Sequence, residues 1–359
     1  MLSDDVVRRM RTAAQLLHRP ARHSPVELVT HLTGVQAQVL SAAGLALRAR
    51  TVGLKAASVD RARVDQRSIV LTWAMRGTLH LIAADDYSWL VPLTTEPSIA
   101  SAYRRLKQER VPDAQVARGL PLISRMLKRE GPLTRAEIAQ RLESHGIRTA
   151  GQAIAHLVWL AAAHAAICYG PDRDGERSFV LVADWLPRSK PLDREAALAE
   201  LAVRYLRSHG PAAPADFAWW SGVRAGDANK AWKAIADRLV EVETERGKAW
   251  VLRSKASEAQ KGIVRLLPAF DEYVLGWKDR DLAALPEHRA KINRGGGWLH
   301  PVVFVDGRLV ATWKLNRAPL RQTVMIEPFT LLSSAVMRGV RAEAKDLATF
   351  TGVPVELGA

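Results

Sequence analysis

The chain has 359 residues, of which 48% are hydrophobic and 25% are charged, a composition typical of a globular protein and not of a disordered one. Its 52 Lys and Arg against 37 Asp and Glu give a formal net charge of +15, which favours nucleic acid over a membrane surface as partner. Cys168 is the only cysteine, which excludes a disulfide framework, a cysteine-based zinc site and an iron–sulfur cluster.

The basic excess is concentrated in the first third of the chain. Residues 1–120 hold 17 basic and 10 acidic side chains, nearly half of the net charge. The alternative is the general basic bias of a GC-rich genome, because Arg greatly outnumbers Lys. An acidic N-terminus with no apolar run after it, and the lack of any segment of bilayer-spanning length, predict a cytoplasmic, nucleoid-associated protein.

The first informative element is a short helix that begins at Ser24 and stops near Gly34. Ser24, with Glu27 three residues later, forms a capping-box signature with proline at the first helical position. Two glutamines, Gln36 and Gln38, follow this helix. A two-stranded ribbon is expected next, over residues 70–73 and 78–82.

An internal repeat at an offset of 79 residues organises the middle of the chain. Arg125–Ala139 reads RMLKREGPLTRAEIA, and Arg204–Ala218 reads RYLRSHGPAAPADFA. In both copies a helix ends at glycine, proline prevents its continuation, and a second helix starts a few residues later. A third helix is expected over residues 152–163 in the first copy and 227–238 in the second.

A ribbon then follows each copy, over 166–169 with 178–182 and over 239–243 with 249–252. Three helices and a hairpin are the winged-helix order. With a weaker copy at the start of the chain, this predicts an α+β fold of three tandem winged-helix modules plus a C-terminal β-barrel-like module. The expected boundaries are 1–113, 114–190, 191–262 and 263–359, the last with strands at 264–267, 302–305 and 309–313 and a helical tail over 331–348.

Most catalytic signatures are absent from the sequence. It contains no G-x-S-x-G turn, H-E-x-x-H pair, P-loop or G-x-G-x-x-G fingerprint, so neither a metal nor a cofactor is expected. The glycines at 295–297 predict a tight connection between strands. The acidic pair Asp271-Glu272 fits a packed loop with a hydrogen-bonding carboxylate better than acid–base catalysis.

Four segments spread over nearly the whole length resemble the HTH_42 winged-helix family, in particular its AlkZ-like branch of bacterial DNA glycosylases. They are Gly34–Gln38 (GVQAQ), Arg76–Leu81 (RGTLHL), Leu267–Tyr273 (LPAFDEY) and Asp306–Arg308 (DGR). The resemblance implies a monofunctional, monomeric enzyme that removes alkylated purines from duplex DNA, with bulky adducts and interstrand crosslinks as further substrates. It also implies that Gln36 and Gln38 are the catalytic Q-x-Q pair. Related members of the YcaQ type carry Asp at the second position, so the glutamine here favours the AlkZ-like subgroup.

Glutamine is chemically sufficient only because of the substrate. A purine alkylated at N7 or N3 is cationic and leaves without protonation, so the enzyme needs to orient a water molecule and place partial negative charge near the sugar. Two carboxamide oxygens serve both needs. Residues two apart on an α-helix, however, point about 200° away from each other. The pair therefore shares a mechanism only if it lies at a helix start or in a turn.

The candidates for DNA contact combine charge with resemblance. They are Arg48, Arg50, Arg76, His80, Trp298, His300 and Arg308, and the Asp306-Gly307-Arg308 turn is expected to act as a probe that enters a groove. For each one, a solvated surface side chain or a satisfied structural one is the alternative. Trp219 and Trp220 are expected to pack in the core of their module.

Two other functions are compatible with the same sequence. One is a non-catalytic winged-helix DNA-binding protein or transcriptional regulator, and the other is a protein that sequesters a DNA-damaging metabolite. Tandem modules in one chain argue against a regulator that binds a palindrome as a symmetric dimer. Abasic-site formation on N7-methylguanine DNA would indicate the enzyme, whereas a sequence-specific footprint on undamaged DNA would indicate the regulator.

Overall fold

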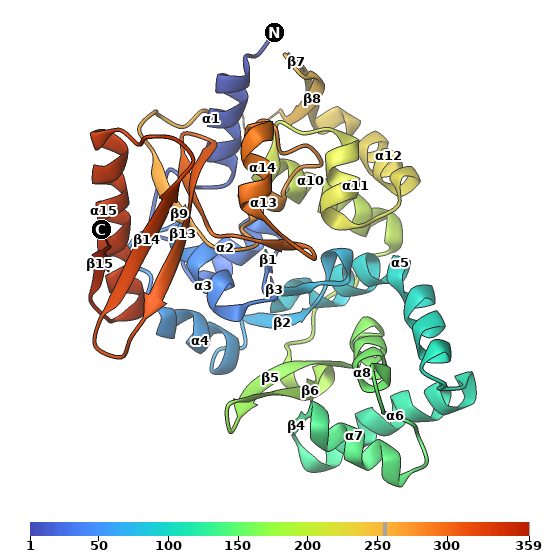
Figure 1. Ribbon diagram of the computed structural model, residues 1–359. Coiled ribbons are helices and arrows are strands. Elements are labelled where there is room, and N and C mark those ends of the chain that lie inside the picture. The colour runs from blue at the N-terminus through green and yellow to red at the C-terminus, as the bar shows by residue number, and fades with distance from the viewer. Residues whose placement is uncertain (254–256, 359) are drawn as a thin grey trace. The chain divides into compact units, whose positions relative to one another are not determined.

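The computed structural model describes residues 1–253 and 257–358, which form two compact units built from helices and sheets (Figure 1). The first unit is discontinuous in sequence. It comprises Met1–Asp60, Ala199–Trp220 and Ala225–Ala359, and the second unit comprises Arg61–Leu198 and Ser221–Arg224. The predicted α+β class is thereby confirmed. Among the described residues, no helix combines the length and apolar character that crossing a bilayer requires.

The second unit contains the first of the two repeat copies. Its elements are α4 (Ala56–Val64, shared with the first unit), β2 (Ile69–Trp73), β3 (Leu79–Ala83), α5 (Tyr87–Gln108), α6 (Asp113–Glu130), β4 (Leu133–Thr134), α7 (Arg135–Ser144), α8 (Ala153–Ala163), β5 (Ile167–Arg173), β6 (Glu176–Leu181) and α9 (Val182–Trp185). The copy follows the predicted order. Helix α6 ends at Gly131, and the capping box of Thr134 and Glu137 starts α7. Strands β4, β6 and β5 then form a small antiparallel sheet.

One local prediction in this copy needs correction. The expected strands at 166–169 and 178–182 left a long connection between them, but β5 and β6 pair up to Arg173 and Glu176, so the turn is only Asp174-Gly175. The register shift between Tyr169 and Asp172 explains the error, because the irregularity interrupts the alternation that marks a strand. Cys168 lies buried in β5, where burial raises the pKa of its thiol.

The first unit carries the second repeat copy and the start of the chain. Its helices and strands before the C-terminal sheet are α1 (Asp4–Ala14), α2 (Pro25–Leu32), β1 (Val35–Gln36), α3 (Leu40–Arg48), α10 (Arg194–His209), α11 (Pro214–Ser221), α12 (Ala225–Ala234), β7 (Leu239–Thr244) and β8 (Gly247–Leu252), and the short elements α13 (Glu272–Leu275), α14 (Arg289–Ile292), β10 (Asn293–Gly295) and β11 (Trp298–Leu299) lie between strands of that sheet. As predicted, α10 ends before Gly210-Pro211 and α11 begins at Pro214, and β7 and β8 form the hairpin.

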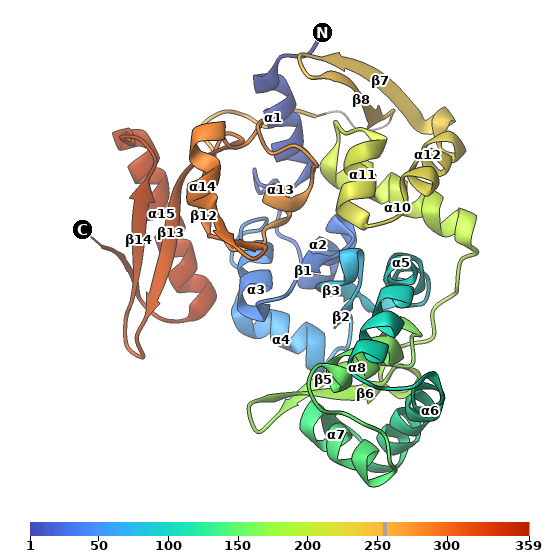
Figure 2. The same cartoon turned by 45° about the vertical axis from the view of Figure 1, so that its right-hand side comes forward.

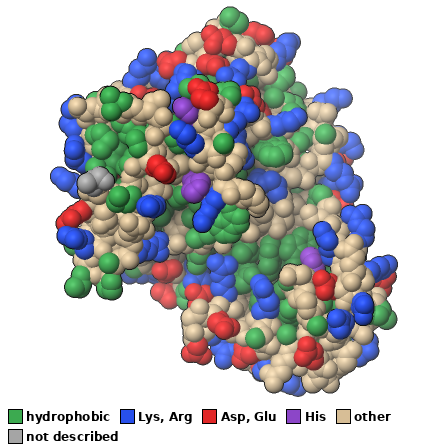
Figure 3. Space-filling model, in the orientation of Figure 1, with side chains coloured by type: hydrophobic (Ala, Val, Ile, Leu, Met, Phe, Trp, Pro, Cys, Tyr) green, Lys and Arg blue, Asp and Glu red, His purple; other side chains and the backbone are tan. Residues whose placement is uncertain are grey.

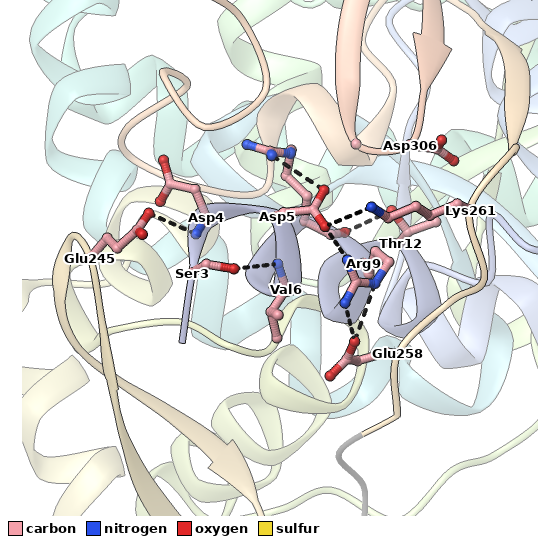
Figure 4. A network of polar contacts seen from close by, with 12 residues as sticks. Ser3, Asp4, Asp5, Val6, Arg9, Thr12, Glu245, Glu258, Lys261 and Asp306 are labelled. Carbon is pink, nitrogen blue, oxygen red and sulfur yellow. Dashed lines mark hydrogen bonds and ion pairs between the residues drawn. The ribbon is translucent and has the colours of Figure 1, made fainter. Parts of the chain in front are cut away.

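Polar contacts fix the start of α1 to distant parts of this unit (Figure 4). The amide of Asp4 donates to Oε2 of Glu245 at 2.9 Å, and Arg9 forms an ion pair of 2.6 Å with Glu258. The Ser3 hydroxyl caps the helix by accepting from the amide of Val6. Helix α1 is therefore a structural part of the second repeat copy, although it lies far from it in sequence.

The C-terminal third forms an antiparallel sheet with one parallel strand. The strand order is β15 (Val355–Leu357), β14 (Gln322–Pro328), β13 (Arg308–Arg317), β12 (Val302–Val305) and β9 (Val264–Leu267). Helix α15 (Ser334–Thr351) packs on it, with Gly339 so close to Val264 that a β-carbon would come within 2.6 Å (Figure 1). The strands at 264–267 and 302–305 match the prediction, whereas β14 and β15 were not predicted.

The turn between β12 and β13 is closed against the protein and does not project. The carboxylate of Asp306 accepts from the amides of Gly262 and Ile263 at 3.0 and 2.7 Å, and the Tyr273 hydroxyl donates to the Gly307 carbonyl at 3.0 Å. Gly307 has a φ of +88°, and a β-carbon there would meet Cβ of Arg8 on α1 at 2.5 Å. The contacts of Asp306 and Gly307 therefore do not favour the prediction that this turn enters a DNA groove as a probe, although Arg308 itself is exposed.

We expect Gly307→Ala to lower the free energy of unfolding by about 2–4 kcal/mol, because the positive φ and the contact with Arg8 both oppose a β-carbon. Gly175→Ala is the matched control, since its φ is +81° but nothing lies within 4 Å of the added carbon. It should cost about 1 kcal/mol. Urea unfolding measures both variants, and equal losses would contradict the close packing of the β12–β13 turn.

Candidate active site

Gln36 and Gln38 lie in a non-helical segment between two helices. Helix α2 ends at Thr33, which has a left-handed φ of 62°, and Gly34 follows with a φ of 124°. Gln36 belongs to the short strand β1, Gln38 lies in a bend, and α3 begins only at Leu40. The opposed directions of residues two apart on a helix therefore do not apply to this pair. Gln36 is buried and Gln38 is exposed.

A buried carboxylate holds the backbone of this segment. Oε1 of Glu272, on the one-turn helix α13 (Glu272–Leu275), accepts from the amide of Gln36 at 2.8 Å. Its Oε2 accepts from the indole nitrogen of Trp220 at 3.1 Å. Glu272 and Trp220 are both fully buried. A charge-assisted bond in such surroundings is short and strong, so Glu272 fixes the position of Gln36.

The neighbouring Asp271 anchors α13 itself. Its Oδ1 accepts from the Tyr273 amide at 2.9 Å, which caps the helix. Both carboxylate oxygens also accept from Arg50, at 2.8 and 2.9 Å, and Arg50 donates further to Oε1 of Gln15 at 2.6 Å. The interpretation of Asp271-Glu272 as a packed, hydrogen-bonding pair agrees with these contacts.

The arginines expected to contact DNA from this region are internal. Arg50 is fully buried in its ion pair with Asp271. Arg48 is equally buried, paired with Glu343 at 3.0 Å and Asp346 at 2.6 Å of α15. Neither guanidinium reaches solvent, so the prediction that Arg48 and Arg50 bind phosphates is corrected. Arg48 connects α3 to α15, and Arg50 connects the end of α3 to α13.

A second hairpin projects where the β12–β13 turn does not. Strands β10 (Asn293–Gly295) and β11 (Trp298–Leu299) pair around glycines that all have positive φ, as a tight connection requires. Trp298 at its tip is 48% exposed, and its ring meets that of Phe270 edge-on with centroids 5.2 Å apart. In both ribbon views this orange hairpin reaches toward β1 (Figures 1 and 2).

The other expected DNA contacts of the first unit differ in accessibility. Arg308 is exposed at the start of β13, and burial of part of its guanidinium, with Arg8 nearby, lowers its pKa. His300 is half-buried, and its amide donates to the Ile292 carbonyl at 2.9 Å. Trp298 and Arg308 thus stay available for DNA contact.

Arg76 and His80 belong to the second unit. Arg76 is half-buried in the β2–β3 turn, with a left-handed φ of 57°. His80 is fully buried in β3, where its Nδ1 lies 2.9 Å from the Thr78 carbonyl. Burial, with Arg76 nearby, lowers the pKa of His80 to about 3, so the ring is neutral. The expected contact of His80 with DNA is therefore not supported, because the side chain is covered.

Basic side chains are spread over the face shown in Figure 3 and interleaved with acidic ones. Among the residues that the structure describes, no three His, Cys, Asp or Glu side chains gather as a metal site would require. The contact that links this segment to a carboxylate runs from the backbone amide of Gln36 to Glu272. The sequence pointed to Glu272 as a structural carboxylate, but its contact with Gln36 spans 236 positions and left no local signal.

The comparisons with known proteins agree over nearly the whole chain. A family described as "DNA glycosylase AlkZ-like" matches residues 29–350. The Streptomyces sahachiroi protein named "Interstrand DNA cross-link repair glycosylase" is 31% identical over 374 aligned positions, covering 96% of this chain and 95% of that protein. The solved structure of Streptomyces sahachiroi DNA glycosylase AlkZ superposes with a TM-score of 0.82 at 29% identity, covering 99% of this chain and 100% of that one.

Proposed function

This chain belongs to the AlkZ-like family of DNA glycosylases, and from that premise we propose that it hydrolyses the N-glycosidic bond of alkylated purines in duplex DNA. The observation that carries the proposal is the position of Gln36 and Gln38, in a non-helical segment whose backbone a buried carboxylate fixes. This arrangement supports a shared role for the pair. The proposed localisation is cytoplasmic and nucleoid-associated, and the proposed working form is a monomer.

The reaction needs little general-acid catalysis by the protein. A base alkylated at N7 or N3 carries a positive charge and departs as a neutral purine, so the barrier lies in the oxocarbenium-like sugar and in the placement of water. We assign the water to Gln38, because its side chain is exposed. The carboxamide oxygen accepts a hydrogen bond from the water. This bond orients the water so that a lone pair of its oxygen points toward the anomeric carbon of the sugar. Gln36 completes the hydrogen bonding of that water or supports the sugar.

Glu272 acts as a positioning residue for this pair and not as an acid or base. Both of its oxygens accept from buried N–H groups, one of Gln36 and one of Trp220. The carboxylate therefore has no role in proton transfer but sets where the glutamine segment lies. Its negative charge beneath the segment also favours the developing positive charge on the sugar.

We expect Glu272→Gln to lower the single-turnover rate about tenfold to a hundredfold, because an amide nitrogen would then face a buried N–H donor and displace the Gln36 backbone. Trp220→Phe removes the other donor and leaves the Gln36 contact intact, so it should lower stability more than rate. The exposed Glu287 provides the control variant Glu287→Gln. An unchanged rate for Glu272→Gln would contradict the positioning role.

The proposed substrates include bulky adducts and interstrand crosslinks. The similar Streptomyces sahachiroi protein is named for crosslink repair, and it aligns with 96% of this chain. The chemistry agrees, because a crosslink through N7 leaves the same cationic purine as a small alkyl group does. A glycosylase that attacks from an exposed glutamine does not need to enclose the base in a deep pocket, which suits a lesion attached to both strands.

The proposed module division is 1–113, 114–190, 191–262 and 263–359, with winged-helix modules in the first three. The order of three helices and a hairpin in α6–β6 and again in α10–β8 supports it. For DNA contact we propose the β10–β11 hairpin with Trp298, together with His300, Arg308 and Arg76. An exposed aromatic at a hairpin tip suits insertion beside a damaged base pair.

The deciding experiment uses duplex DNA with a single N7-methylguanine. Incubation with the protein should leave an abasic site that alkali converts to a strand break, and a crosslinked duplex should separate into single strands on a denaturing gel. Undamaged duplex of the same sequence is the control. Binding without base release from either damaged duplex would reject the enzyme in favour of a DNA-binding protein.

A further inference from the structure

A cavity of about 330 Å³ lies within the first unit, apart from the glutamine segment. Its wall includes Tyr273 of α13, the helix whose first residue, Glu272, contacts Gln36. The remaining wall comes from α1, α11 and the chain on either side of α14 (Arg289–Ile292). Its volume is at the lower end of the range for small-molecule sites.

One of the aromatic side chains in the wall is accessible to solvent. Trp219 of α11 is 47% exposed at the cavity, whereas the sequence had suggested that both tryptophans of its pair pack in the core. Only Trp220 does so. Trp277 also lines the cavity; it is buried, and its indole nitrogen donates to the His209 carbonyl at 3.0 Å. A flat ring that enters the cavity therefore meets one exposed and one buried indole.

Two arginines in the wall have no carboxylate within ion-pair distance among the described residues. Arg11 lies with its guanidinium 4.3 Å from the ring centre of Trp277, and the hydrogen bond of this guanidinium runs from Nε to the Pro211 carbonyl at 3.1 Å. Arg280 has only a long contact of 3.4 Å with Oδ1 of Asn293. Neither forms an ion pair within residues 1–253 and 257–358. Arg289 beside them, by contrast, is paired with Asp281 and Asp279.

Burial lowers the pKa of both guanidinium groups; the charge of Asp216 opposes this effect at Arg11, and the charge of Arg289 adds to it at Arg280. An arginine that is partly removed from water and forms no direct ion pair is costly, and an anion at the same place offsets that cost. The planar guanidinium also has free N–H groups in the fork that matches carboxylate and phosphate oxygens.

We propose that this cavity binds a flat aromatic group that carries a carboxylate or a phosphate. The ring lies against Trp219 and the apolar wall, and the anion pairs with Arg11 and Arg280. Two sources have this chemistry, a nucleotide of a DNA strand and a free aryl anion. The proposal is separate from the glycosylase activity, because neither Gln36 nor Gln38 lines the cavity.

The test is isothermal titration of the full-length protein with two anions, dGMP and quinoline-2-carboxylate, and with their neutral counterparts, deoxyguanosine and quinoline. We expect at least one anion to bind and its neutral counterpart to bind about tenfold more weakly or not at all. Equal affinity of anion and neutral ring, or no binding of either anion at millimolar concentration, would overturn the proposal.

Variants locate the binding. Arg11→Met and Arg280→Met keep the aliphatic stem but remove the charge. Each should weaken the affinity for the anion about tenfold, equivalent to about 1.4 kcal/mol of binding free energy. Trp219→Ala should weaken the affinity for ligands of both ring systems. Because Trp219 is exposed, this substitution should not unfold the protein. Arg104→Met, at an exposed position of α5, is the control. Unchanged affinity in all three cavity variants would place the ligand elsewhere and overturn the proposal.

A competition experiment distinguishes the two sources of the ligand, a nucleotide of a DNA strand and a free aryl anion. Undamaged duplex DNA is added to protein saturated with the anion, and the release of the anion is followed by dialysis. Displacement supports occupation by a nucleotide of the strand, and simultaneous binding supports a free aryl anion. These measurements need no base release, so they remain decisive even if the proposed glycosylase function fails.

Discussion

Gln38→Ala should lower release of N7-methylguanine from duplex DNA by at least about a hundredfold, or about 3 kcal/mol in transition-state stabilisation. The side chain is exposed in a bend of the segment that follows β1, so its removal leaves no cavity in the core. The loss should therefore appear in the single-turnover rate, while thermal stability and affinity for the damaged duplex stay near those of the unaltered protein.

Two further variants make the Gln38 result specific. Gln38→Asp keeps an oxygen that accepts from water and should retain more activity than Gln38→Ala, whereas Gln140→Ala, at an exposed position of α7, should change nothing. Quantitative excision assays and fluorescence anisotropy on the same duplex provide the rate and the affinity. Full activity of Gln38→Ala would show that the water is held by other groups, and the two-glutamine mechanism would be abandoned.

Arg50→Met should destabilise the protein by about 3–5 kcal/mol, because it leaves the fully buried carboxylate of Asp271 without its counter-charge. Asp271 caps α13, and α13 carries Glu272, so the loss should also lower the excision rate. Chemical denaturation followed by circular dichroism measures the change in unfolding free energy. A phosphate-binding arginine would behave differently, with weaker DNA affinity and little change in stability.

The double variant Arg50→Met with Asp271→Asn separates the charge from the packing. It removes the unpaired negative charge, and asparagine can still accept from the Tyr273 amide, so the pair of changes should cost less than Arg50→Met alone. Arg338→Met, at an exposed position of α15, is the control and should cost nothing measurable. If the double variant is less stable than Arg50→Met, the unpaired buried charge of Asp271 is not the main effect.

Sequence reasoning succeeded where the determinant is local. The capping box of Ser24 and Glu27 spans four residues of sequence, and it starts α2 in the structure as predicted. The end of α6 at Gly131 follows from the chemistry of one residue and the proline after it. The family itself could also be recognised, because its segments are short and contiguous.

The basic charge of the first third of the chain led to the prediction that Arg48 and Arg50 contact DNA, and the structure places both in the interior instead. Their partners Asp346 and Asp271 lie 298 and 221 positions away, so nothing nearby in sequence distinguishes an internal arginine from a surface one. The position of Glu272 beneath Gln36 is hidden by the same separation. The Asp306-Gly307 turn was correctly identified as a turn, but its contacts with Gly262 and Ile263 decide whether it projects, and these are tertiary.

The division of the first unit has a consequence for how the protein is made. The glutamine segment leaves the ribosome early, but the Glu272 that holds it is synthesised after both segments of the second unit, Arg61–Leu198 and Ser221–Arg224. The N-terminal residues must wait without their carboxylate partners until the C-terminal third emerges, whereas the second unit is complete once residue 224 has been made. A chain that ends before Glu272 would thus lack the contact that fixes the backbone of Gln36.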